Sequence, residues 1–374
     1  MSALRPLSVY IHIPFCKSKC AYCDFASWPG REDVWEAYFA ALCEEIRAAG
    51  DGKHRVETIF FGGGTPSLAP EESIGAALQA VREAFPVAPE AEVSLEANPG
   101  TLSMEKLRAY REMGVNRLSI GVQSFDACLL REIGRIHTPG EAKEAARMAQ
   151  AAGFANISLD LMYGLPGQDL ATWQSTLKTA LSLPVQHISA YALIVEEGTP
   201  IAARAPELPG DEEVLSMQRE GTRALAAAGF ARYEISNYAR KGFACRHNIV
   251  YWRRGEYRGF GCAAHSFFGG ERFENPARLE DYLGGVRGQN RERVDGEGAQ
   301  EETLMLSTRM REGLSLRAWR EKYGVEFLSG REARVERLRR AGLLEIAEGF
   351  LRLTERGMEV HNTVVLELLC AGEN

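Results

Sequence analysis

The chain has 374 residues, a formal net charge of −7 and a hydrophobic fraction of 45%. This length accommodates one large domain and a smaller one around ordinary globular cores. The acidic balance excludes a general affinity for nucleic acid or anionic membranes. No apolar run approaches the about 20 residues of a membrane span, and the N-terminus lacks the apolar core of a signal peptide. We therefore predict a cytoplasmic protein, in which thiols stay reduced.

Strand and helix patterns alternate through the first 200 residues. The strand patterns cover residues 7–13, 56–61, 92–97, 117–122, 158–162 and 187–193, and the helix patterns cover 34–48, 71–84, 103–113, 141–152 and 171–181. Six such units in series predict parallel strands with right-handed crossovers, in a doubly wound sheet or an open barrel. Reactive residues follow the first five strands, where α/β barrels place their sites. The pattern therefore favours a partial (β/α)6 barrel.

Three cysteines follow the first strand pattern at the spacing C-x3-C-x2-C: Cys16, Cys20 and Cys23. Thiols clustered at a strand end of a cytosolic chain indicate a metal site. Structural zinc requires four ligands, and an iron–sulfur cube normally takes four thiolates. Three thiolates would hold three irons of a cube and leave the fourth iron open to an outside ligand. A zinc site completed by His12, or plain buried cysteines, stay open as alternatives.

The cysteine spacing, with Tyr22 directly before the third cysteine, resembles the motif of the radical S-adenosylmethionine superfamily. The resemblance implies a [4Fe–4S] cluster on the three cysteines. It also implies that the amino and carboxylate groups of S-adenosylmethionine bind the open iron. Electron transfer to the sulfonium would then release a 5′-deoxyadenosyl radical. The partial (β/α)6 barrel is the fold of this superfamily.

The second strand pattern leads into three glycines that include Gly63 and Gly64, followed by Thr65. Glycines let the backbone approach a ligand without an intervening Cβ, although a sharp turn would also explain them. The resemblance implies that this segment hydrogen-bonds the amino group of S-adenosylmethionine. Tyr10, near the end of the first strand pattern, is also assigned to the cofactor site by the resemblance.

Polar residues at the next three strand ends match the cofactor contacts of the superfamily. Glu96 is expected at the ribose hydroxyls or the sulfonium, with a solvated charge near a turn as the alternative. Gln123 and Arg135 are positioned like cofactor contacts. Arg135 could pair with the cofactor carboxylate, or form an ion pair on a helix surface. Asp160 resembles the ribose-binding carboxylate, and its alternative is a buried structural role.

Residues 233–266 are rich in aromatics, glycine and polar groups, and their weak periodicity predicts binding loops. They contain the run His-Asn-x-x-Tyr-Trp from His247 to Trp252. This run resembles the hallmark of a family of heme chaperones, and the resemblance implies heme binding: an imidazole is a natural axial ligand of heme iron, the rings of Tyr251 and Trp252 offer flat faces, and Arg253 and Arg254 could neutralise propionates. The alternatives are a loop histidine bonded to backbone and a solvated arginine pair.

From Tyr10 to about Ser266 the chain resembles the oxygen-independent coproporphyrinogen III oxidases and their paralogues, the HemW-type heme chaperones. Three features favour the chaperone branch. Phe25 stands where the oxidase has a fourth cysteine, nine residues precede Tyr10 where the oxidase has a long arm, and the His-Asn-x-x-Tyr-Trp run marks the chaperones. Cys245, two residues before His247, raises the question of covalent heme attachment.

The last part of the chain predicts a winged-helix-like α+β shape. Helix patterns at 314–323 and 332–341 precede a hairpin within 343–357. Arginines crowd the second helix, but interspersed acids dilute the positive charge that DNA-binding domains concentrate on one face, so we expect no nucleic-acid binding. We predict three parts: a radical S-adenosylmethionine core at 1–200, a family-specific segment at 201–295 and a C-terminal domain at 296–374.

The resemblance implies a heme chaperone that binds heme and passes it to an acceptor protein, with a protein of the respiratory chain as a candidate acceptor. The implied cofactors are a [4Fe–4S] cluster, S-adenosylmethionine and heme. The alternative functions are radical decarboxylation of coproporphyrinogen III, or a radical enzyme for another substrate, because fold does not fix chemistry. Peripheral membrane contact, a monomer and a homodimer are all compatible with the resemblance, and no catalytic residue is assigned.

Overall fold

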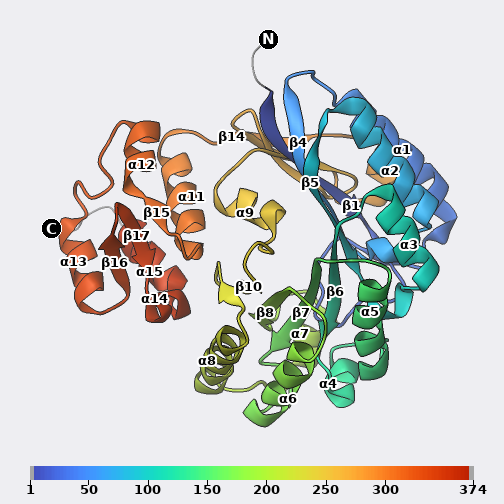
Figure 1. The fold of residues 1–374 in the computed structure, drawn as a ribbon. Helices are drawn as coiled ribbons and strands as arrows, with labels where there is room; N and C mark the ends of the chain where they lie inside the picture. Colours follow the sequence, from blue (N-terminus) through green and yellow to red (C-terminus); the bar gives the residue numbers. More distant parts are fainter. Residues whose placement is uncertain (1–3, 370–374) are drawn as a thin grey trace.

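The computed structural model describes residues 4–369, and its main body is a curved sheet of twelve strands with helices along the outer face (Figure 1). Six parallel strands form its centre: β1 (Arg5–Ile13), β4 (His54–Gly63), β5 (Val87–Ala97), β6 (Arg117–Gln123), β7 (Ile157–Tyr163) and β8 (His187–Ala192). The helices between them are α1 (Trp35–Ala48), α2 (Glu71–Ala84), α3 (Met104–Met113), α4 (Ala127–Glu132), α5 (Pro139–Ala151) and α6 (Leu170–Leu181). The predicted partial (β/α)6 barrel is confirmed.

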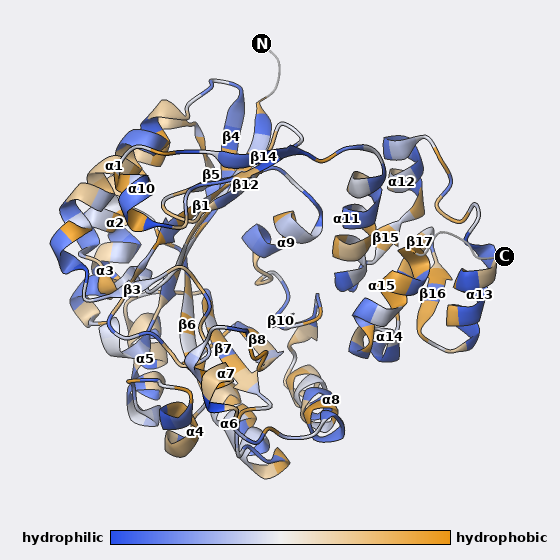
Figure 2. Ribbon diagram, turned by 180° about the vertical axis from the view of Figure 1, so that it is seen from behind, coloured by the Kyte–Doolittle hydropathy of each residue, from blue (hydrophilic) through white to orange (hydrophobic). Residues whose placement is uncertain are grey.

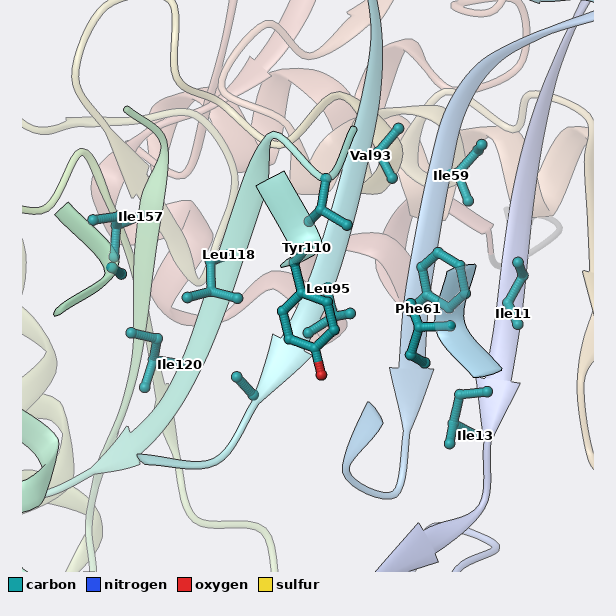
Figure 3. Packing of buried hydrophobic residues seen from close by; sticks show 14 of the residues in the cluster. Ile11, Ile13, Ile59, Phe61, Val93, Leu95, Tyr110, Leu118, Ile120 and Ile157 are labelled. Carbon is teal, nitrogen blue, oxygen red and sulfur yellow. The ribbon is translucent and has the colours of Figure 1, made fainter. Parts of the chain in front are cut away.

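Side chains alternate between the two faces of the central strands, as the strand geometry requires. Ile11 and Ile13 of β1, and Ile59 and Phe61 of β4, belong to the large buried core, and Figure 3 shows the equivalent residues of β5 and β6 beside them. The alternate positions carry polar or aromatic groups, namely Tyr10, His12, Thr58, Phe60, Glu96, Ser119, Asp160 and Tyr191. The apolar side chains of the outer face thus form the core under the helices, and the concave face carries the polar and aromatic side chains.

The sheet continues beyond the six central strands at both edges. One edge adds β11 (Tyr257–Phe260), β12 (His265–Phe268), β13 (Glu271–Glu274) and β14 (Gln289–Arg293), and the other adds β10 (Asn237–Ala239) and β9 (Ala231–Arg232). β11 pairs with β1 in parallel, whereas the outer strands are antiparallel. The expectation of binding loops over 233–266 is therefore wrong for much of this region. Its strands have only three or four residues, too few for a clear alternation.

The helix α9 (Arg246–Trp252) lies on the concave side of the sheet (Figure 1). Its first turn is held by the carboxylate of Glu92 on β5, which accepts from the backbone N–H groups of Arg246 and His247 at 3.1 and 3.0 Å. Such a carboxylate satisfies N–H groups that have no partner within the helix, and it complements the helix dipole. Glu92 therefore fixes the position of the His-Asn-x-x-Tyr-Trp run inside the barrel.

A second, separate core lies in the C-terminal part. A sheet in the order β15 (Leu314–Ser315), β17 (Phe350–Leu353), β16 (Leu344–Ala347) packs with α11 (Gly296–Arg309), α12 (Leu316–Tyr323), α13 (Glu332–Arg340), α14 (Glu355–Glu359) and α15 (His361–Leu369). Figure 2 shows hydrophobic residues gathered on β16, β17 and α15. Two helices followed by a hairpin agree with the predicted winged-helix-like α+β fold, to which the structure adds α11, α14 and α15.

Ion pairs join the C-terminal part to the main body. Arg309 on α11 pairs with the fully buried Glu234 at 3.2 Å, and Glu359 on α14 pairs with Arg219 at 2.8 Å. Arg219 belongs to α8 (Asp211–Ala227), which follows α7 (Pro200–Arg204), and α10 (Leu279–Leu283) lies beside α1.

Within the part of the chain that the structure describes, no helix is long and apolar enough to cross a lipid bilayer.

Candidate metal and cofactor site

The three predicted cluster ligands lie on one loop at the carboxyl end of the barrel strands. Cys16 ends the short strand β2 (Phe15–Cys16), and Cys20 and Cys23 follow in turns. The loop is anchored through Ala21, whose N–H donates to the carbonyl of Ile133 at 3.0 Å and whose carbonyl accepts from Ile201 at 2.9 Å. The loop that carries the cysteines is therefore tied to the chain after α4 and to α7.

All three thiols are free and line one cavity of about 360 Å³. Burial raises the pKa of Cys16 and of Cys23 above the ordinary value of 9.0. Thr65 donates a hydrogen bond to the sulfur of Cys16 at 3.6 Å, and Arg135 donates to the sulfur of Cys20 at 3.4 Å. Since iron binds thiolates, proton release must accompany metal loading.

The zinc alternative finds no support in the geometry. Among residues 4–369, no three His, Cys, Asp or Glu side chains come together as ligands of a single metal ion. The ring nitrogens of His12 bond instead to the hydroxyl of Tyr10 and to the carbonyl of Ala26, at 3.0 and 2.9 Å. Three free thiols around one cavity suit a larger group held at three points, and this donor set fits an iron–sulfur cube.

The glycine segment at the end of β4 is hydrogen-bonded to the chain that leads into the cysteine loop. Gly64 and Thr65 donate their N–H groups to the carbonyls of Ile13 and Phe15 at 2.8 Å. Gly63 has φ +109°, and a Cβ there would lie 2.5 Å from the imidazole of His12. Gly64 is equally restricted, because a Cβ would lie 2.7 Å from the carbonyl oxygen of Phe15. These glycines are therefore required by close approach of the chain to itself.

Two half-buried carboxyl groups, Glu96 and Asp160, line the same cavity. Burial raises the pKa of Glu96 to about 8, and the nearby charge of Asp160 adds to this effect. Burial also raises the pKa of Asp160, against the opposing influence of Arg117. Ser119 donates to Asp160 at 3.2 Å. Two acids in the wall of one cavity favour a cationic ligand, and S-adenosylmethionine, with its sulfonium and amino groups, is such a ligand.

Arg135 and Gln123 complete the polar wall. Arg135 donates to the carbonyl of Gly121 as well as to Cys20, and its buried Nε has no hydrogen-bond partner within the described residues. Gln123 has φ +65°, and its amide oxygen accepts from the hydroxyl of Tyr191 at 3.1 Å. An unsatisfied guanidinium N–H in a buried site fits a carboxylate ligand such as that of S-adenosylmethionine.

The structure brings most of the predicted residues together. The cavity is lined by Cys16, Cys20, Tyr22, Cys23, Gly63, Gly64, Thr65, Glu96, Gln123, Arg135 and Asp160. Ser119, Tyr191 and Ile194 also line it and were missed. Alternation would have placed Ser119 and Tyr191 on the concave face. Tyr10 lines a neighbouring cavity instead, and His247 lines neither.

The neighbouring cavity has a volume of about 660 Å³ and shares Phe25, Gly63 and Glu96 with the first. Its walls include the aromatic side chains of Tyr10, Tyr251, Trp252, Tyr257 and Phe267. Arg254 also lines it, whereas Arg253 pairs with Glu312 on the surface. This second cavity is large, aromatic and directly adjacent to the cysteine cavity.

His247 is completely buried beside this cavity. Its Nδ1 lies 2.8 Å from the hydroxyl of Thr58, its Nε2 lies 2.8 Å from the hydroxyl of Tyr251, and its ring stacks on Phe60. Burial lowers its pKa to about 3. The alternative to heme ligation is a loop histidine whose ring bonds to the backbone. In the structure His247 lies on the helix α9, and its ring bonds to the side chains of Thr58 and Tyr251.

Comparison with known proteins agrees with the fold. The model of the radical SAM superfamily matches residues 10–180, and that of the HemN C-terminal domain matches residues 294–360. Coproporphyrinogen III oxidase (HemN) from Escherichia coli superposes with a TM-score of 0.86 at 23% identity, covering 98% of this chain and 90% of that one. The chain thus has the radical SAM fold with a HemN-type C-terminal domain.

Individual relatives with high sequence identity identify the family more specifically. The heme chaperone HemW of Escherichia coli is 44% identical over 269 residues, 71% of each chain. HemW of Bacillus subtilis is 37% identical over 369 residues, which is 96% of this chain and 97% of that one. The protein therefore belongs to the HemW family of heme chaperones.

Proposed function

We propose that this protein is a heme chaperone that binds heme and transfers it to an acceptor protein, and that it carries a [4Fe–4S] cluster and S-adenosylmethionine. The observation that carries the proposal is the identity of 37% to HemW of Bacillus subtilis along nearly the whole chain. The His-Asn-x-x-Tyr-Trp run on α9, beside an aromatic cavity, supports it.

In this proposal, the residues that line the cysteine cavity bind the cluster or S-adenosylmethionine. Cys16, Cys20 and Cys23 hold the cluster, which together with S-adenosylmethionine supplies one-electron chemistry when both are bound. The other lining residues hold S-adenosylmethionine: Tyr22, Gly63, Gly64, Thr65, Glu96, Gln123, Arg135 and Asp160. Tyr10 lies on the wall of the second cavity, where its hydroxyl bonds to His12 and orients the imidazole of His12.

Ligation of heme iron by His247 stays a prediction, and it requires a rearrangement of the hydrogen bonds seen in the structure. One of the two hydrogen bonds to Thr58 and Tyr251 must break before a ring nitrogen can reach iron. Covalent attachment through Cys245 meets a similar condition, because this thiol is fully buried and lies 3.5 Å from the carboxylate of Glu92. Non-covalent binding in the second cavity requires neither rearrangement.

The division of labour along the chain is part of the same proposal. Residues 1–200 bind the cluster and S-adenosylmethionine. Residues 201–295 contain the heme-binding motif, and residues 296–374 contact the barrel or a partner. A cytoplasmic location follows from the need to keep three cluster thiols reduced. A heme acceptor of the respiratory chain, peripheral membrane contact and the choice between monomer and homodimer are further parts of this proposal.

Anaerobic titration tests the proposal directly. The reconstituted protein is titrated with hemin, and the loaded protein is then mixed with an apo-haemoprotein whose heme-bound spectrum is distinct. Stoichiometric binding followed by transfer supports a chaperone. Incubation with coproporphyrinogen III, S-adenosylmethionine and a reductant is the second arm. Formation of protoporphyrinogen there, or failure to bind hemin, would overturn the proposal.

A further inference from the structure

The seven histidines of this chain differ sharply in accessibility, and all seven lie within the described residues. Six of them are buried, with at most 6% of their surface exposed: His12, His54, His137, His187, His247 and His361. His265, at the start of β12, is the exception, because 67% of its side chain is exposed. His265 also lines the second cavity. The one freely accessible imidazole therefore faces the large aromatic cavity beside the cysteine site.

The other two histidines near this cavity are held in place. His12 bonds through both ring nitrogens to Tyr10 and Ala26, and His247 is fixed in the same way by Thr58 and Tyr251. Removing either from its partners would leave a buried polar group unsatisfied, which is unfavourable. His265 carries no such cost, since its side chain is largely in solvent.

A carboxylate lies within contact distance of His265. The Nε2 atom of His265 lies 3.2 Å from Glu274 on the adjacent strand β13. Imidazoles that ligate metals commonly donate their second ring N–H to a carboxylate, which fixes the orientation of the ring and raises its basicity. Contact of one ring nitrogen with Glu274 leaves the other available as a ligand.

The remaining groups of the cavity match a flat, dianionic macrocycle. Arg254 and Arg272 both line the cavity, pack over Phe267 and share the one carboxylate of Glu302. These three groups leave one net positive charge for acidic substituents. The indole N–H of Trp252, also on the wall, is buried without a hydrogen-bond partner within residues 4–369. Such a donor is satisfied when an acceptor of a ligand enters.

From these observations, and resting on the proposed heme-chaperone function, we propose that heme binds in the second cavity with His265 as an axial ligand of its iron. The propionates face Arg254, Arg272 and the indole N–H of Trp252, and the macrocycle lies against Tyr251, Tyr257 and Phe267. The hydrogen bond between His247 Nε2 and the hydroxyl of Tyr251 holds Tyr251 on the cavity wall. The shared residues Phe25, Gly63 and Glu96 place the heme next to the cluster site.

The test compares hemin with metal-free protoporphyrin IX on the full-length, cluster-loaded protein. His265→Ala should weaken hemin about tenfold or more, since even the loss of a residue that only orients a ligand costs that much. It should leave protoporphyrin IX affinity within about twofold. His265→Gly should regain the wild-type hemin spectrum when free imidazole is added. An unchanged hemin affinity and spectrum in His265→Ala, or equal losses for both porphyrins, would overturn the assignment.

A second pair of variants tests the cavity independently of iron ligation. Arg272→Gln should weaken hemin but leave its dimethyl ester unaffected, because the ester lacks the propionate charges. Arg253→Gln, at an exposed arginine that lies outside the cavity lining, is the matched control and should change neither. An equal effect of both substitutions on hemin contradicts the cavity. If wild-type protein binds no hemin at all, the proposed function fails, and not only the place of the ligand.

Discussion

The Nε2 atom of His247 lies 2.8 Å from the hydroxyl of Tyr251, one helical turn later on α9. Residues four positions apart share one face of a helix, which gives the spacing of the His-Asn-x-x-Tyr-Trp run a structural reason. Thr58 on β4 binds the other ring nitrogen. The run thus lies on the concave side of the sheet, where Tyr251 and Trp252 line the second cavity.

The first prediction concerns the stability that this contact provides. His247→Ala should lower the free energy of unfolding by about 2–4 kcal/mol, because it opens a buried space and removes the hydrogen-bond partner of the Tyr251 hydroxyl, whereas Thr58 keeps its hydrogen bond to Ser8. Tyr251→Phe should cost about 1 kcal/mol, and the double variant should cost less than the sum. Urea unfolding measures all three. Arg253→Ala, exposed directly after the helix, is the control, and strict additivity would contradict the coupling.

The second prediction concerns acid stability. Burial lowers the pKa of His12 and His137 to about 4, and that of His247 to about 3, from the ordinary 6.5. The unfolded chain therefore binds protons on these rings at a higher pH than the folded chain does. Their contribution to stability is fully present above pH 6.5 and is lost as the pH falls to about 4, by about 1–3 kcal/mol each.

His137→Gln provides the check on this pH dependence. The amide can replace the hydrogen bond that joins His137 Nε2 to the carbonyl of Val122 at 3.1 Å, but it does not titrate. Thermal midpoints measured between pH 4 and 7 should fall less steeply in the variant than in the wild type. The same slope in both proteins would show that His137 contributes nothing to acid unfolding.

The third prediction concerns the cluster ligands. Serine at Cys16, Cys20 or Cys23 should each abolish cluster assembly, whereas the wild-type chain should load about four irons and four sulfides. Iron and sulfide analysis after anaerobic reconstitution measures this. Cys128→Ser, at an exposed cysteine outside the cavity, is the matched control and should load normally. Full iron in any of the three ligand variants would exclude the proposed ligand set.

The fourth prediction uses two glycines with positive φ. Gly63→Ala should destabilise the protein clearly more than Gly52→Ala. A Cβ at Gly63 meets the ring of His12 at 2.5 Å, whereas nothing lies within 4 Å of a Cβ at Gly52. The Gly52 variant bears only the backbone cost of a left-handed residue, about 1 kcal/mol. Thermal unfolding compares the two, and equal losses would show that the contact with His12 relaxes freely.

The barrel could be predicted from the sequence because its elements are long and strongly patterned. The predicted helix 71–84 coincides with α2, and the predicted strand 117–122 differs from β6 by one residue. The strand predicted at 92–97 begins earlier, at Val87, because the register shifts between Val56 and Thr58 where β4 pairs with β5. Local alternation contains no information on such a shift.

The cofactor residues could be predicted because most lie near or just after the carboxyl ends of strands that share one edge of the barrel, where their side chains meet. The burial of His247 could not be predicted, since it depends on Glu92, more than 150 positions earlier, holding the first turn of α9. His265 carried no signal by itself. Its importance follows from the burial of the other six histidines, which only the tertiary structure reveals.

The fifth prediction follows from the half-buried carboxyl group of Glu96 in the cysteine cavity. Its pKa is raised from 4.5 to about 8 by burial and by the charge of Asp160, so the folded protein holds a proton that the unfolded chain has released. The stabilising contribution of this proton is fully present below pH 4.5 and is lost as the pH rises through about 8. Glu96→Gln should therefore raise the thermal midpoint of the cluster-loaded protein, and the gain should increase from pH 6 to pH 9.

S-adenosylmethionine should reverse this order of stability. A sulfonium or ammonium group near Glu96 favours the charged carboxylate, so the ligand should stabilise the wild type more strongly than Glu96→Gln at pH 8. Glu144→Gln, at an exposed position on α5, is the control and should respond like the wild type. Midpoints with and without S-adenosylmethionine provide the comparison. Equal ligand-induced shifts in wild type and Glu96→Gln would mean that the carboxyl group does not contact the cationic part of the ligand.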